Sequence, residues 1–184
     1  EFSGVRMEAT TGGPIVPFDI ELVFLDNGTA SQDAAVRAAA ARWMTIITTD
    51  IADIDMSIQP VEADACVDGQ PLVNDIIDDI RIYIVIEEID GHEKTVAFAS
   101  LCVTRGLSKL PLMATITFDA KDLPALEESG DIGAVIIHEL GHVLGIGTVW
   151  DLFGLLQNPS VPSNAGVDTH FDGPLAIVAF DDAG

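Results

Sequence analysis

Alternation of apolar and polar residues predicts four β-strands in this chain. The most regular is residues 79–88, in which every second position from 80 to 86 is isoleucine. Residues 18–26 begin with the same alternation, and Asn27 after them opens a turn signal. The other two segments with strand character are residues 95–103 and 112–118. Each pattern predicts a strand that turns one apolar face toward a core.

A helical periodicity predicts two helices that pack on these strands. From residue 32 to about residue 48, alanines and larger apolar side chains recur at helical spacing, and Ser31 precedes them as a candidate N-cap. The second helix runs from Asp131, whose carboxylate is expected to cap free N–H groups, to about Leu144. Gly145 then favours a left-handed helix end. The order strand, helix, strands, helix is typical of a mixed α/β layer.

The segments outside these elements are loop-like and suggest a division of the chain. Residues 49–75 are polar and rich in aspartate, and residues 146–184 are rich in Gly, Pro and Asp, with one short helix predicted at 175–180. We therefore predict an N-terminal subdomain at 1–145 and the start of an incomplete second subdomain at 146–184. No apolar run reaches the ~18–20 residues that a membrane-spanning helix needs.

Composition and charge narrow the classes of function. Hydrophobic residues make up 48% of the 184 positions, which supplies a core and excludes a disordered chain. The net charge of −22 repels phosphate backbones and argues against nucleic acid as a partner. We interpret the acidity as a solvated surface, with bound calcium as the alternative. Neither Asp-rich cluster, Asp50, Asp53 and Asp55 or Asp75, Asp78 and Asp79, has the spacing and glycine of an EF-hand loop.

The candidate chemistry lies in the second predicted helix, where residues 138–142 are HELGH. His138 and His142 are four residues apart, so one helix presents both imidazoles on the same face, as zinc ligands require. Glu139 is then the general base that takes a proton from a water held by the zinc. The alternative is a polar helix face that carries these residues by chance. Apolar neighbours on both sides predict a buried helix instead, in which histidines need partners.

The longer string HELGHVLGIGTVW, residues 138–150, resembles the leishmanolysin-type metzincins. Four further segments resemble the same family, so the likeness covers nearly the whole chain. They are residues 40–50, 78–91, 112–123 and 171–176.

This resemblance implies a fold, an activity and a location. The fold is zincin-like: a twisted, mostly parallel sheet with an antiparallel edge strand, one backing helix and one active-site helix. The edge strand binds an extended peptide through main-chain hydrogen bonds, and we expect residues 112–118 to be that strand. The activity is a secreted zinc endopeptidase that acts on protein or peptide substrates. A secreted protein with an even cysteine count favours one disulfide between Cys66 and Cys102 over two free thiols.

The third zinc ligand departs from the usual metzincin pattern. Common metzincins have a histidine at the position of Thr148, whereas leishmanolysin-type enzymes supply it after a long insertion and follow it with a methionine-containing turn. No methionine occurs after Met113. We therefore expect the third ligand beyond Gly184, in a missing C-terminal part of the protein. The alternatives within the chain are Asp151, Asp168 and, best by chemistry, His170.

Two other functions remain open at this stage. One is a catalytically inactive zincin-like domain that serves in binding or adhesion, against which the intact Glu139 argues. The other is an unrelated calcium-stabilised structural domain, against which the near full-length resemblance argues. His92, in the turn at 90–92, is interpreted as a surface residue.

Overall fold

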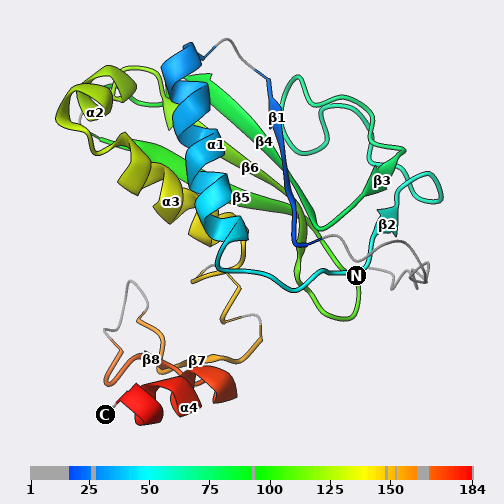
Figure 1. The fold of residues 1–184 in the computed structure, drawn as a ribbon, viewed down its shortest axis with the longest axis vertical. Coiled ribbons are helices and arrows are strands. Elements are labelled where there is room, and N and C mark those ends of the chain that lie inside the picture. The colour runs from blue at the N-terminus through cyan, green and yellow to red at the C-terminus, as the bar shows by residue number, and fades with distance from the viewer. Residues whose placement is uncertain are drawn as a thin grey trace. The chain divides into compact units, whose positions relative to one another are not determined.

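A computed structural model describes residues 17–25, 28–92, 94–147, 149–151, 153–160 and 166–183 of the chain (Figure 1). The predicted turn residue Asn27 and Thr148 lie outside these residues. The chain divides into two compact units, Glu1–Leu144 and Gly145–Gly184. The first unit contains the main sheet.

The first unit is built on a four-stranded, mainly parallel sheet with the strand order β1-β4-β6-β5. The strands are β1 (Ile20–Phe24), β4 (Ile80–Glu87), β5 (Ala97–Thr104) and β6 (Pro111–Asp119). β1 pairs parallel with β4, and β4 pairs parallel with β6. β5 pairs antiparallel with β6. The predicted mixed α/β class with a mostly parallel sheet and an antiparallel edge strand is therefore confirmed at this level.

The position of β6 corrects one prediction. Residues 112–118 were expected at the edge of the sheet, but β6 lies between β4 and β5 and is buried over its whole length. Thr115 and Thr117 suggest a solvated face in the sequence, yet both are less than 5% exposed. A strand that is buried on both faces belongs inside a sheet. The antiparallel edge strand of this sheet is β5.

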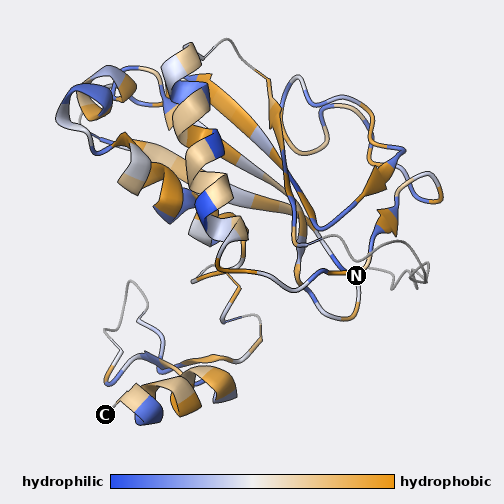
Figure 2. Cartoon of the chain, in the orientation of Figure 1, coloured by the Kyte–Doolittle hydropathy of each residue, from blue (hydrophilic) through white to orange (hydrophobic). Residues whose placement is uncertain are grey.

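Helices cover one face of the sheet. In Figure 1, α1 (Ala30–Met44) and α3 (Ile132–Val143) lie side by side across the strands, and α2 (Leu123–Ser129) precedes α3. Apolar side chains of α1, α3 and the three parallel strands form one core cluster, visible as the apolar colouring of these elements in Figure 2. This packing holds α3, the helix with the HELGH motif, against the sheet.

The helix ends differ in detail from the prediction. Thr29, and not Ser31, caps α1: its side chain accepts from the Gln32 N–H, and the Gln32 side chain accepts from the Thr29 N–H in return. Asp131 stands at the N-cap position of α3 as expected, but among the described residues its side chain makes no capping hydrogen bond. The α2 helix was not predicted at all.

A long loop covers part of the opposite face. It includes the two-stranded pair β2 (Ile54–Asp55) and β3 (Ile76–Ile77), and its apolar side chains form a second cluster on Tyr83 of β4 and Met113 of β6. Cys66 in this loop is disulfide-bonded to Cys102 in β5, as predicted. Pairing of β5 with β6 slips between residues 101 and 103, so Cys102 is the extra residue of a β-bulge. The bulge lets the strand turn this side chain toward the loop.

Asp119, the last residue of β6, holds the loop that leads into β5. Its Oδ2 accepts the N–H groups of Ile89, Asp90 and Gly91, each at 3.2 Å, and its Oδ1 accepts the Lys121 N–H at 2.8 Å. These bonds favour the ionised form and lower the pKa of Asp119. The start of the edge strand is therefore fixed to the end of its neighbour.

The second unit is small. It contains the short antiparallel pair β7 (Leu156–Gln157) and β8 (His170–Phe171), followed by α4 (Pro174–Ala183). The rings of Trp150 and Phe171 stack at a centroid distance of 4.4 Å. Among the described residues of both units, no helix is long and apolar enough to cross a membrane.

Candidate metal centre

Helix α3 places its apolar and polar side chains on different faces. Ile136, Leu140 and Val143 recur at helical spacing, and all three are at most 1% exposed in the core beneath the helix. His138 and His142 lie on an adjacent face, where His138 is exposed and His142 is half-buried. The core contacts therefore fix the rotation at which the helix presents both imidazoles.

The two imidazoles converge through their Nε2 atoms. These atoms are 3.0 Å apart, and the rings meet edge to face, at 85° with centroids 4.5 Å apart. Two nitrogens bound at about 2.0–2.1 Å to one tetrahedral zinc ion lie roughly 3.3 Å from each other. The observed separation is within a few tenths of an ångström of that value. The residues therefore fit a shared metal ion in donor type and spacing.

Glu139 follows the first histidine and is largely buried. It is 8% exposed, and within the part of the chain that the structure describes its carboxylate makes no hydrogen bond or ion pair. Its carboxylate oxygens reach solvent, since they are not among the buried side-chain atoms that lack a hydrogen bond. The carboxylate is therefore free to act beside an ion held by the neighbouring histidines.

Glycines follow the helix as predicted. The cap residue Leu144 donates its N–H to Leu140 O at 3.0 Å, and Gly145 then has a φ of 101°. Gly147 has a φ of 83°. A left-handed glycine at this place is a common helix end. The expected third-ligand position of common metzincins, Thr148, comes immediately afterwards and lies outside the described residues.

One contact of the site was missed in the sequence. Trp43, near the end of α1, donates its indole N–H to the main-chain carbonyl of Ile137 at 3.1 Å. Ile137 is the residue before His138 in α3. The two residues are 94 positions apart in the chain, so no periodic pattern reveals the contact. Only the α-helical periodicity of residues 32–48 hinted that Trp43 faces the core.

The other predicted candidates lie elsewhere. His170 is in β8 of the second unit, where its Nδ1 is 2.6 Å from the Asp168 carbonyl oxygen. Asp168 and Asp151 are exposed residues of the same unit. In the first unit, the exposed ring of His92 lies 2.7 Å from Asp122 at the start of α2, so this surface histidine helps to hold a loop. His170 stays an untested candidate for the third ligand.

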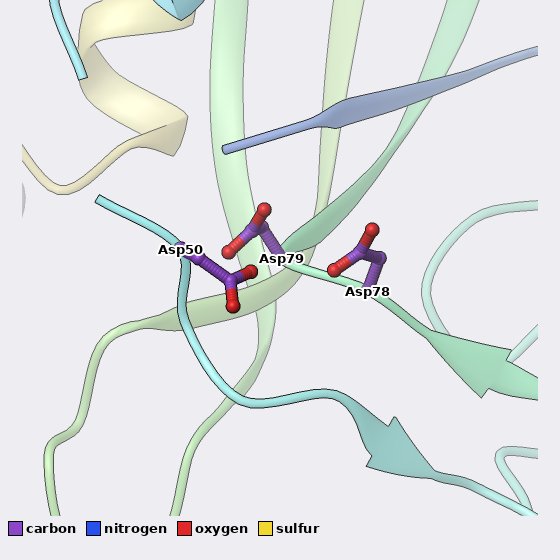
Figure 3. A group of neighbouring side chains, drawn as sticks. All are labelled: Asp50, Asp78 and Asp79. Carbon is purple, nitrogen blue, oxygen red and sulfur yellow. The ribbon is translucent and has the colours of Figure 1, made fainter. Parts of the chain in front are cut away.

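The Asp-rich clusters of the sequence come together at the edge of the long loop (Figure 3). Asp50 follows α1, while Asp78 and Asp79 precede β4, and carboxylate oxygens of the three lie within 4.8 Å of one another. Both oxygens of Asp79 are used, since they accept the N–H groups of Asp19 and Ile51 at 2.7 Å. Nearby, Arg105 donates to the carbonyl oxygens of Asp78 and Asp79. The cluster thus joins four segments of the fold.

Burial and like charge act together on Asp78. Desolvation raises the pKa of this carboxyl group to about 6, with further increases from the negative charges of Asp79, Asp53 and Asp50. Asp75, which the sequence groups with Asp78 and Asp79, forms a two-bond pair with Arg81 instead, at 3.0 and 2.9 Å, and this pair lowers the pKa of Asp75. Asp75 and Asp79 are therefore already held by hydrogen bonds within the fold.

Comparison with known proteins gives no name for this site. No protein-family model matches the chain, and no curated protein matches it significantly. The functional proposal consequently depends on the residues of α3 and their surroundings.

Proposed function

We propose that this chain carries the zinc-binding and proton-transfer residues of a secreted endopeptidase of the leishmanolysin-type metzincin class. The observation that carries the proposal is the convergence of His138 and His142, with Nε2 atoms 3.0 Å apart, beside Glu139, whose carboxylate is unpaired among the described residues. Donor type, spacing and an adjacent unpaired acid are the combination that metal-assisted peptide hydrolysis needs.

Each residue has a distinct role. His138 and His142 hold the metal through Nε2 as neutral imidazoles. A bound zinc ion supplies Lewis acidity, which makes water easier to deprotonate and a peptide carbonyl easier to attack. Glu139 accepts the proton of the attacking water and returns it to the leaving amine.

The sheet supports the same class of enzyme. β5 is an antiparallel edge strand, and α3 packs directly against it as well as against β6. A sheet edge of this kind offers unpaired main-chain groups to an extended peptide. We therefore transfer the substrate-binding role from residues 112–118, which lie inside the sheet, to β5. An extended protein or peptide segment beside β5 is the substrate that we propose.

The cellular location is proposed from the disulfide. Cys66 and Cys102 are bonded, and disulfides persist in oxidising compartments. This agrees with a secreted protein. The acidic surface, with a net charge of −22, keeps such a protein soluble.

The third ligand is proposed to come from a downstream part of the protein, with His170 as the alternative. Catalytic zinc sites ordinarily use three protein ligands, so residues 1–184 alone should bind zinc weakly and show little hydrolysis. His170→Ala should leave that weak affinity unchanged. Calorimetric titration with zinc measures the affinity of the parent chain and of His170→Ala. Tight one-to-one binding that disappears in His170→Ala would instead make His170 the ligand.

The test of the function itself compares metal uptake with hydrolysis. The metal-free full-length protein should regain casein cleavage when zinc is added, and His142→Ala should take up less zinc and cleave nothing. Met44→Leu, a conservative change in α1, is the matched control and should behave as the parent. Zinc uptake without hydrolysis would favour the alternative of an inactive binding domain. Absence of uptake would contradict the zinc site.

A further inference from the structure

Trp43 links helix α1 to the part of α3 that carries the two histidines. Its indole N–H donates to the Ile137 carbonyl at 3.1 Å. Among the side-chain hydrogen bonds of the described residues, this is the only one between α1 and α3. At the other end of α1, Ser31 and Gln32 contact Glu127 of α2 instead. Among the described residues, the side-chain hydrogen bond that joins α1 to α3 is therefore the one donated by Trp43.

The carbonyl group that accepts this bond belongs to Ile137, the residue directly before His138. In a regular α-helix the carbonyl of Ile137 also accepts the N–H of Gly141, so it closes the turn from which His138 projects and which leads directly to His142. A second donor on the same oxygen fixes the tilt of that peptide group. Apolar packing under α3 is non-directional. The indole bond therefore restrains small rotations and shifts that packing alone tolerates.

We propose that Trp43 is a positioning residue for the metal site: its N–H holds the peptide group before His138, so that His138 and His142 present their Nε2 atoms to one ion. This inference rests on the proposed zinc site and adds a residue from a different helix to it. Trp43 touches neither the ion nor the substrate, and it acts through the main chain of α3.

The expected effect is on metal binding more than on folding. The hydrogen bond is at the surface, where water replaces a lost partner, so its net contribution to stability is small. Groups that orient metal ligands typically affect metal affinity by about 10- to 100-fold. Loss of the N–H should therefore weaken the ion's binding while the fold persists.

The experiment replaces the N–H and measures the metal directly. Trp43→Phe keeps an aromatic ring, and β-(3-benzothienyl)alanine at position 43 keeps the shape of the indole but has sulfur where the N–H was. Zn²⁺ affinity is measured by competition with a coloured chelator, and the Co²⁺ absorption spectrum reports the ligand geometry. We expect about tenfold weaker Zn²⁺ binding and a changed Co²⁺ spectrum in both proteins. If Trp43→Phe does not fold, the protein with benzothienylalanine at position 43 alone shows whether loss of the N–H weakens Zn²⁺ binding.

Gln32→Ala is the matched control in the same helix. It removes the Gln32 side-chain half of the capping box of α1 and the contact with Glu127, but leaves the Trp43–Ile137 bond in place, so Zn²⁺ affinity should stay within about twofold of the parent. Parental affinity in both position-43 proteins would overturn the role of Trp43 and leave the zinc site intact. Equal weakening in Gln32→Ala would overturn it too, because general loosening of α1 would explain both. A parent that takes up neither ion would overturn the zinc site as well.

Discussion

At the scale of single residues, a substitution at Glu139 tests catalysis separately from metal binding. Glu139 lies between the two histidines in the sequence but is not itself a proposed ligand. Glu139→Gln keeps the size of the side chain and removes its basicity. In the full-length protein we expect kcat/KM for peptide cleavage to fall by about 10²- to 10⁴-fold, with zinc still bound. Cleavage assays together with metal analysis of the purified variant measure both. Equal proteolysis by variant and parent would contradict the proton-transfer role.

Asp78 is a residue whose ionisation the fold opposes. Burial, followed by the charges of Asp79, Asp53 and Asp50, raises its pKa from 3.8 to about 6. The folded state therefore holds a proton that the unfolded chain releases between these pH values, and the free energy of unfolding falls as pH rises through that window. Stabilisation from protonated Asp78 is complete below the lower value and is lost above the upper one.

Asp78→Asn, which cannot ionise, should therefore be more stable than the parent at neutral pH. We expect a gain of about 1 kcal/mol, since partial exposure to solvent screens the full shift, and no gain in acid below the unfolded pKa. Urea unfolding at both pH values measures this. Asp55→Asn is the control, because contacts with Ser57 lower the pKa of Asp55, so this change should bring no gain at neutral pH. A loss of stability in Asp78→Asn at neutral pH would contradict the assignment.

For single residues, the sequence predicted contacts that arise within one helix, but it did not predict hydrogen bonds between segments that are distant in the chain. His138, Glu139 and His142 are brought together by helical spacing alone, so the motif sufficed. The Trp43–Ile137 bond and the three N–H groups of residues 89–91 on Asp119 depend on segments that meet only in the folded chain. No residue spacing signals such contacts.

At the scale of elements, regular alternation predicted the four main strands, and burial explains the one misplacement. The edge position of residues 112–118 was expected from the family resemblance, whereas both faces of β6 are covered. The α2 helix was missed because its seven residues are too few for a clear period, and Asp122 gives it no side-chain cap. Contacts from Ser31 and Gln32 to Glu127 help to hold this helix instead.

The disulfide between the long loop and β5 is the element-scale feature with the largest expected effect on stability. Cys66 and Cys102 are 36 residues apart, and closing a loop of that length in the unfolded chain is worth roughly 3–4 kcal/mol in the chain-entropy model. The double variant Cys66→Ala, Cys102→Ala should lose about that much free energy of unfolding. Chemical denaturation measures it, and the reduced parent is the matched control. Unchanged stability of both proteins would show that the loop is held by packing alone.

At the scale of the whole molecule, the charge of −22 opposes compaction. Screening by salt should relieve this repulsion, so raising NaCl from about 10 mM to about 0.5 M should raise the thermal midpoint. The matched control is CaCl₂ at equal ionic strength. The same shift in both salts would indicate screening. A clearly larger shift with calcium would instead indicate a specific calcium site, and no shift in either would contradict the charge effect.

The parallel pairing of β1 with β4 also has a consequence for how the protein is made. Ile20 pairs with Ile80, so sixty residues must follow the first strand before its partner exists. At roughly 5–20 residues per second, a ribosome needs about 3–12 s to supply them. The β5–β6 hairpin, by contrast, closes at Thr104 and Pro111 as soon as both strands are made. β1 therefore spends seconds without the strand that pairs with it, and its main-chain groups stay unpaired on that side until β4 is made.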